Sequence, residues 1–115
     1  MLNWRKFTAI YIRPGYTDMR KAINGLTEIV EAEMKLNLFD SNIFIFCGKR
    51  KRSLKILFWD RNGFCLIQKR LEQDRYAWPK NQQQAQQLTH NDLDLLLQGI
   101  DFTRRHKNLT FLSVS

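Results

Sequence analysis

The first part of the chain shows a strand-like pattern of apolar positions followed by a helix-like one. Residues 7–12 are rich in aromatic and β-branched side chains, which predicts a strand that ends at Pro14 and Gly15. Apolar residues then recur at helical spacing, which predicts a helix over residues 18–35 with Thr17 as its N-cap. The helix residues expected to pack on a sheet are Met19, Ile23, Leu26 and Val30.

The middle of the chain carries short apolar runs separated by turn signals. Residues 43–47 are apolar throughout, as in a central strand that is covered on both faces. Residues 54–59 and 64–71 have the pattern of two further strands, and the DRNG sequence between them predicts a hairpin turn. Residues 76–78 predict another short strand, which Pro79 ends. Alternation along residues 54–59 places Leu54, Ile56 and Phe58 on one face and Lys55, Leu57 and Trp59 on the other.

The last part of the chain predicts one more helix. Residues 80–87 form a polar link, after which Thr89 is a candidate N-cap with Asp92 at the capping-box position. The apolar face of this helix comprises Leu93, Leu96 and Leu97, and Gly99 is a suitable C-terminal stop. Residues 103–115 are expected to be a tail or an edge strand. We therefore expect a single α+β domain, with its core at about residues 7–102, in which a mainly antiparallel β-meander packs against one long N-terminal helix and a short C-terminal helix.

The composition is that of a folded globular domain, since 43% of the 115 residues are hydrophobic and 26% are charged. The chain has no apolar run long enough to cross a membrane and no signal-peptide pattern, so we expect a cytoplasmic protein. Cys47 and Cys65 each lie in an apolar run, as expected of reduced, buried thiols rather than of a disulfide scaffold.

Charge is unevenly distributed along the chain, whose net charge is +8. Residues 48–80 hold ten basic and three acidic side chains, a net charge of +7, whereas residues 27–47 have a net charge of −3. The most concentrated stretch is the run Lys49, Arg50, Lys51 and Arg52, which we call the basic turn because it joins two predicted strands. Adjacent like charges repel and add nothing to a core, so this excess favours a polyanionic partner.

Residues typical of catalysis or metal binding do not form a recognisable motif. Six of the seven aspartates lie at predicted turns or element ends, where caps and turns account for them. His90 and His106 lack neighbouring ligands at the spacing of a zinc site, and the chain has no glycine-rich phosphate loop. We therefore predict no catalytic residue, no metal and no cofactor.

The basic turn predicts contact with nucleic acid phosphates. The first candidates are Lys49, Arg50, Lys51, Arg52 and Lys55, followed by Lys69 and Arg70, and then by Arg20 and Lys21 near the start of the predicted helix. Lys69 and Arg70 are adjacent, so in a regular strand they point to opposite faces. The aromatic residues Trp59, Phe64, Tyr76 and Trp78 could stack on bases, but their strand-patterned surroundings favour a place in the core.

Several motifs, taken in order, resemble a known family. They are YTDMRKAINGL at residues 16–26, LKILFWDRNGFCLIQKRLE at 54–72, RYAWP at 75–79 and LLLQGID at 95–101. In this combination the chain resembles the TnpB accessory proteins of the insertion-sequence-sixty-six (Orf-two-like) family of bacterial transposable elements. The resemblance covers about residues 10–102 and only loosely the tail beyond them.

The resemblance implies a small protein that is encoded beside a separate, larger transposase and is needed for efficient transposition. It implies DNA, at the element ends or the target, and the transposase as partners. The lack of a long apolar run separately predicts no membrane partner. We therefore expect a non-catalytic accessory protein that binds DNA through the basic turn. Two alternatives remain open: a subunit that docks on an acidic surface of the transposase, and a small nuclease that uses His106 or a turn aspartate. The sequence does not indicate an oligomeric state.

Overall fold

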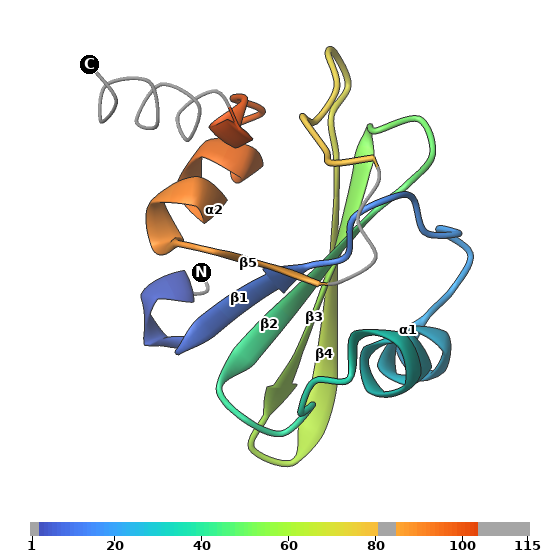
Figure 1. Ribbon diagram of the computed structural model, residues 1–115, viewed down its shortest axis with the longest axis vertical. Helices are drawn as coiled ribbons and strands as arrows, with labels where there is room; N and C mark the ends of the chain where they lie inside the picture. Colours follow the sequence, from blue (N-terminus) through green and yellow to red (C-terminus); the bar gives the residue numbers. More distant parts are fainter. Residues whose placement is uncertain (1–2, 81–84, 104–115) are drawn as a thin grey trace.

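The computed structural model describes residues 3–80 and 85–103, which form a small α+β domain built on a five-stranded sheet. The strands are β1 (Ala9–Ile12), β2 (Asn42–Cys47), β3 (Ser53–Asp60), β4 (Gly63–Arg70) and β5 (Gln86–Leu88), and their order across the sheet is β4-β3-β2-β1-β5. β1 pairs with β2 in parallel, and the other neighbours are antiparallel (Figure 1).

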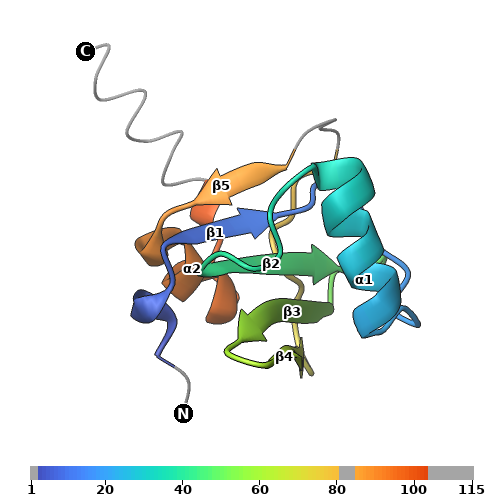
Figure 2. The ribbon, with the colours of Figure 1, turned by 90° about the horizontal axis from the view of Figure 1, so that it is seen from below.

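Helices cover the two faces of this sheet. Helix α1 (Ile23–Ile29), which continues into the π-helical turn η2 (Val30–Met34), lies on one face, and α2 (His90–Leu97) lies on the other, beside the short 3₁₀ turn η1 (Trp4–Lys6) (Figures 1 and 2). The α1 side of the core contains Leu26, Val30, Phe44, Phe46 and Leu57. The α2 side contains Ile43, Ile45, Leu54, Ile56, Phe58, Leu93 and Leu96.

The predicted faces of the central strands are confirmed. Every residue of β2 is buried, as expected of a strand covered on both faces. In β3, Leu54, Ile56 and Phe58 belong to the α2 side of the core, whereas Leu57 belongs to the α1 side. The DRNG hairpin is also confirmed, because Asp60 pairs with Gly63, although the positive φ of 55° falls on Arg61 rather than on Asn62.

The predicted long helix is wrong, because α1 begins at Ile23 and not at residue 18. Thr17 is buried and is not an N-cap: its backbone N–H donates to the Cys47 carbonyl at 2.8 Å, and its hydroxyl accepts a bond from Arg13 at 3.0 Å. Asp18 forms a local turn instead, in which its carboxylate accepts the Arg20 N–H at 2.9 Å. The contact of Thr17 with the end of β2 and the local turn at Asp18 therefore take the place of the expected first helical turn.

The sheet also departs from a simple meander. β2, β3 and β4 form the expected antiparallel meander, but β1 reaches β2 through the α1 crossover and pairs with it in parallel. Residues 86–88, expected to be part of a polar link, form the edge strand β5, in which Leu88 is buried. Residues 76–78 are not a strand; Tyr76 and Trp78 are instead buried side chains of the α2 side of the core.

The end of the domain agrees with its sequence signals. The Thr89 hydroxyl accepts the Asp92 N–H and the Asp92 carboxylate accepts the Thr89 N–H, both at 3.0 Å, which completes the predicted capping box. Gly99 adopts a φ of 77° just after α2, a conformation that glycine adopts without strain. The predicted tail beyond Thr103 lies outside the described residues. Across residues 3–80 and 85–103, no helix has the length and hydropathy of a membrane span.

Candidate nucleic-acid interface

The basic turn is the tight connection between β2 and β3. The Gly48 N–H donates to the Ser53 carbonyl and the Lys51 N–H donates to the Gly48 carbonyl, each at 3.0 Å. Lys51 adopts the left-handed conformation, with a φ of 60°, that closes the turn. The side chains of Lys49, Arg50 and Arg52 are exposed, because a turn this short has no interior in which to bury them.

The segment that follows β4 holds the basic turn in place. The carbonyl of Arg52 accepts the Leu71 N–H at 2.8 Å, and the carbonyl of Lys51 accepts the Tyr76 N–H at 2.7 Å. Because Tyr76 is itself 2% exposed, the turn is anchored to the core and not only to its own strands. The charged side chains therefore project from a fixed backbone.

A third segment, residues 13–19, lies on the other side of the basic turn. The Trp78 indole Nε1–H lies 3.1 Å from the Arg13 carbonyl and 2.8 Å from the Gly15 carbonyl, and donates to both. The Gly15 N–H donates to the Pro79 carbonyl at 2.8 Å. The Trp-Pro motif noted in the sequence thus serves to position this segment.

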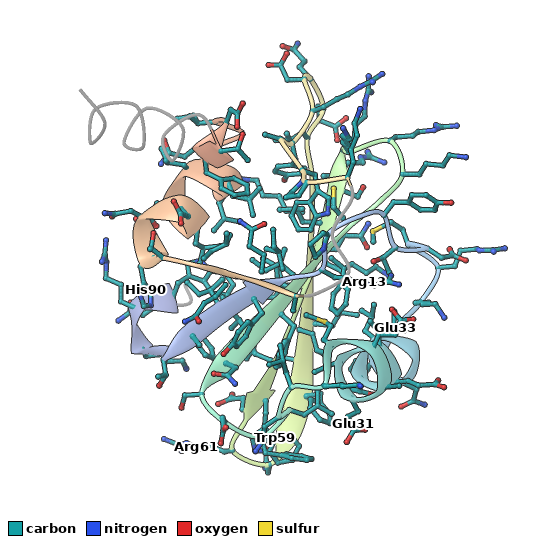
Figure 3. The ribbon with its side chains drawn as sticks, viewed as in Figure 1. Arg13, Glu31, Glu33, Trp59, Arg61 and His90 are labelled. Atoms are coloured by element: carbon teal, nitrogen blue, oxygen red, sulfur yellow. The ribbon has the colours of Figure 1, made fainter. Side chains whose placement is uncertain are left out.

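Ion pairing adds a further restraint on residues 13–19. Arg13 points toward Glu33 of η2, with 2.6 Å between Nη2 and Oε2, and donates to the Thr17 hydroxyl through Nη1 (Figure 3). The same guanidinium therefore connects the end of β1 with η2 and with Thr17. This contact holds the segment against the α1 side of the sheet.

The three segments line an open groove of about 750 Å³. It lies at the end of the sheet where β2 turns into β3 and β4 ends, and Figure 1 shows how the strands meet at this end. Its lining residues are Tyr16, Thr17, Asp18, Met19, Gly48, Lys49, Arg50, Arg52, Ser53, Arg70, Leu71 and Glu72. We call this feature the basic groove, because four of these residues are cations and two are carboxylates. Gly48 permits its narrow base, since a Cβ there would lie 2.8 Å from Met19 Cγ.

Both carboxylates of the basic groove are paired with arginines. Asp18 contacts Arg20 through two oxygens, with 2.8 Å between Arg20 Nη2 and Asp18 Oδ2. Glu72 accepts from Arg70 Nε and Nη2 at 3.1 and 3.0 Å. The hydrogen bonds from Arg20 lower the pKa of the exposed Asp18 carboxyl to about 2, and the same contact raises the pKa of Arg20. Among the described residues, the groove cations that form no ion pair are Lys49, Arg50 and Arg52.

The structure brings some of the predicted contact residues together. Lys49, Arg50, Arg52 and Arg70 line the basic groove. Arg20, whose side chain is 91% exposed, lies at its rim through the contact with Asp18, and the next residue, Lys21, is exposed. Lys51 is half-buried and does not line the groove.

Two of the predicted lysines lie elsewhere. Lys55 is 8% exposed, and its ammonium group donates to the Lys21 carbonyl at 2.7 Å, so it supports the segment before α1 from within the sheet. The Lys69 ammonium group donates to the Leu97 carbonyl at the end of α2, on the opposite face from Arg70. There its positive charge complements the negative end of the helix dipole.

Two residues of the groove wall, Tyr16 and Met19, were not predicted from the sequence to belong to a site. Tyr16 is 63% exposed, and the Lys49 ammonium group lies 5.8 Å from the centre of its ring. The available signal was an aromatic residue directly after the Pro14-Gly15 turn, at the start of the YTDMRK motif. Met19 was assigned to the helix, whereas it lies before α1 and contributes to the groove.

The remaining polar candidates have structural partners. His90 Nε2 lies 3.0 Å from the Phe7 carbonyl, at the junction of α2 with η1 (Figure 3). Burial raises the pKa of the Cys47 thiol to about 12, so it is protonated at neutral pH. Within the described part of the chain, no three histidine, cysteine, aspartate or glutamate residues gather as a metal ion would require. His106 lies outside the described residues.

These features define a small α+β domain with a preformed cationic groove, an architecture suited to binding a polyanion. The chain belongs to the IS66 Orf2-like protein family, whose model matches residues 8–107. This match confirms the resemblance inferred from the motifs. Family membership associates the protein with transposition in an accessory role.

Two relatives come from Sinorhizobium fredii, and both are described as uncharacterized proteins. One, y4hO, is 37% identical over 102 residues, which cover 89% of this chain and 87% of the relative. The other, y4jC, is 31% identical over 87 residues, which cover 76% of this chain and 74% of the relative. No solved structure matches the chain.

Proposed function

We propose that this protein is a non-catalytic accessory protein of DNA transposition that binds DNA in the basic groove. The observation that supports this proposal is the convergence of Lys49, Arg50, Arg52 and Arg70 on one open groove whose walls are anchored to the core. Because the backbone that carries these exposed cations is already fixed, little conformational entropy is lost when a ligand binds, which favours affinity.

Phosphate contact is the chemistry that this groove supports best. Arginine presents planar, forked donors that match phosphate oxygens, and lysine adds a mobile positive charge. Each phosphate neutralised releases condensed counterions, so binding depends strongly on salt. Lys51, Arg20 and Lys21 extend the positive surface around the groove, whereas Lys55 and Lys69 are not part of the proposed contact set because their ammonium groups bond to backbone carbonyls.

The groove gives a second candidate function some support. Arg70 and Glu72 form an exposed ion pair at its edge, and such a pair could exchange partners with a carboxylate of another protein. On this alternative, the basic turn docks on an acidic surface of the separately encoded transposase.

Charge reversal tests the proposal. The variant Lys49→Glu/Arg50→Glu/Arg52→Glu should bind fluorescently labelled DNA at least about a hundredfold more weakly, and the slope of log affinity against log salt should fall by roughly 2 to 3. Fluorescence anisotropy over a salt series measures both quantities. The matched control is Lys6→Glu/Lys35→Glu/Arg61→Glu, which makes the same charge change at exposed positions outside the groove.

The outcomes separate the candidate functions. Unchanged DNA binding by the groove variant, or an equal loss in the control, would show that the groove is not the DNA site. Loss of transposase from a pull-down with unchanged DNA binding would favour the docking function. Metal-dependent cleavage of DNA by the purified protein would contradict a non-catalytic role.

A further inference from the structure

We infer that the basic groove takes single-stranded DNA, with the Tyr16 ring as a platform on which an unpaired base stacks. This inference rests on the proposed function, since it names the form of DNA bound at the same groove. It concerns Tyr16 because, within the described part of the chain, this is the one aromatic residue that lines the groove, and phosphate binding alone leaves its ring without a role.

Tyr16 combines an exposed ring with a backbone that is held on both sides. Its side chain is 63% exposed, although tyrosine ordinarily covers much of its ring against neighbouring residues. The residues on both sides are fixed: the Gly15 N–H bonds to the Pro79 carbonyl and the Thr17 N–H bonds to the Cys47 carbonyl, each at 2.8 Å. The ring is therefore presented at the groove with little backbone freedom to lose.

Positively charged side chains lie near the Tyr16 ring. The Lys49 ammonium group lies 5.8 Å from the ring centre, and Arg50 and Arg52 line the same groove. Single-strand binders combine a positive groove that follows the backbone with aromatic rings that stack on successive bases. The juxtaposition of Tyr16 with Lys49 offers both contacts to one nucleotide, and Met19 adds an apolar surface to the same wall.

The shape of the groove disfavours a duplex. Inside double-stranded DNA the faces of the bases are stacked on one another, so an exposed tyrosine ring has no free base face to contact there. The basic turn is bonded to Leu71 and Tyr76, and so it does not project as a free ribbon that could enter the major groove. A volume of about 750 Å³ is that of a pocket for a small ligand, which suits one or two nucleotides.

The test compares Tyr16→Ala with Tyr16→Phe on two probes, a short labelled oligothymidylate and a duplex of equal length. Tyr16→Ala should weaken binding to the single strand about tenfold, because stacking on one ring is lost. Tyr16→Phe should keep the affinity, and duplex binding should be unchanged in both variants. The matched control is Phe39→Ala, which removes another exposed ring, 59% exposed, outside the groove.

A second measurement reports stacking directly. An oligonucleotide that contains 2-aminopurine should lose fluorescence on binding to the wild-type protein and to Tyr16→Phe, but not to Tyr16→Ala. Circular dichroism of each variant verifies its fold.

The results distinguish this inference from the proposed function. If Lys49, Arg50 and Arg52 are required but Tyr16→Ala binds the single strand like the wild type, the groove binds DNA and the stacking inference is wrong. An equal loss on both probes would also overturn it. If the charge-reversal variant binds both probes normally, the proposed function itself fails.

Discussion

Between residues 49 and 55, the place of a lysine in the turn or in the strand decides whether its charge is exposed. Lys49 lies in a tight turn and projects into the groove, whereas Lys55 lies in β3, where the pleat directs it to the covered α1 face. The buried Lys55 side chain extends to the Lys21 carbonyl, to which its ammonium group donates. Of these two lysines of the same charged stretch, Lys49 thus lines the groove and Lys55 has a structural role.

Replacing Lys55 separates these two roles. Lys55→Met should lower the free energy of unfolding by about 2 kcal/mol, because the bond from a charged donor to the Lys21 carbonyl is lost. Urea denaturation measures this change, and the salt dependence of DNA binding should stay as in the wild type. The control Arg52→Met should do the reverse: it should weaken binding and leave stability unchanged. A Lys55→Met protein of wild-type stability would contradict the structural role.

The Asp18 carboxyl should remain largely ionised at about pH 3, where an ordinary aspartate is mostly protonated. Its pKa is lowered from 3.8 to about 2, chiefly by the hydrogen bonds from Arg20. A lowered pKa in the folded state means that the contact stabilises the fold above about pH 4, and that this contribution is lost as the pH falls through 2. The chemical shift of the Asp18 carboxyl carbon, measured by NMR as a function of pH, should give a titration midpoint of about 2.

Substitution of Arg20 supplies the control for this titration. Arg20→Gln should move the Asp18 midpoint back toward 3.8, because the charged donor that holds the carboxylate is gone. A wild-type midpoint near 3.8 would mean that the pair does not persist in solution.

At the scale of elements, the capping box of Thr89 and Asp92 is a sequence signal that directly stabilises the start of α2. Thr89→Ala removes the hydroxyl that accepts the Asp92 N–H, and should cost about 1 kcal/mol of stability. For a domain of this size, thermal unfolding followed by circular dichroism should show a midpoint about 5 °C lower. Thr89→Ser keeps the acceptor and should retain most of the stability. Equal losses in both variants would assign the effect to packing rather than to capping.

Elements with complete local signals were predictable from the sequence. The capped helix α2, the buried strand β2 and the DRNG hairpin each carry their own pattern, and the structure confirms them. The start of α1 was not predictable in this way, because Thr17 looks like a cap but bonds to the end of β2. β5 was missed because an edge strand needs few apolar residues, and its pairing partner, β1, is distant in the sequence.

At the scale of the whole molecule, the candidate site is assembled from three segments that are far apart in the sequence. The sequence indicated the basic turn, because its charge is contiguous, and it indicated Arg70 less strongly. It did not indicate Tyr16, since exposure of a ring depends on how residues 13–19 pack against Trp78 and Pro79. Convergence of segments is a property of the fold and leaves no local pattern.

The two ends of the sheet have different chemistry. The basic groove lies at one end, whereas the DRNG hairpin at the other end carries Trp59 and Arg61 (Figure 3). There Phe39, Trp59 and Phe64 form an aromatic cluster with ring centres 4.9 to 5.8 Å apart. A ligand in the groove therefore leaves this cluster uncovered.

The position of β5 has a consequence for the order of events during synthesis. β2, β3 and β4 are joined by short turns and can pair as soon as they leave the ribosome, but β1 has its outer edge covered only when Leu88 comes to lie against Ile10. A nascent chain that stalls before Gln86 presents an open strand edge, which is a template for aggregation. Among the described residues, β5 is thus the strand that covers the β1 edge, and it is the last of the five strands of the sheet to be synthesised.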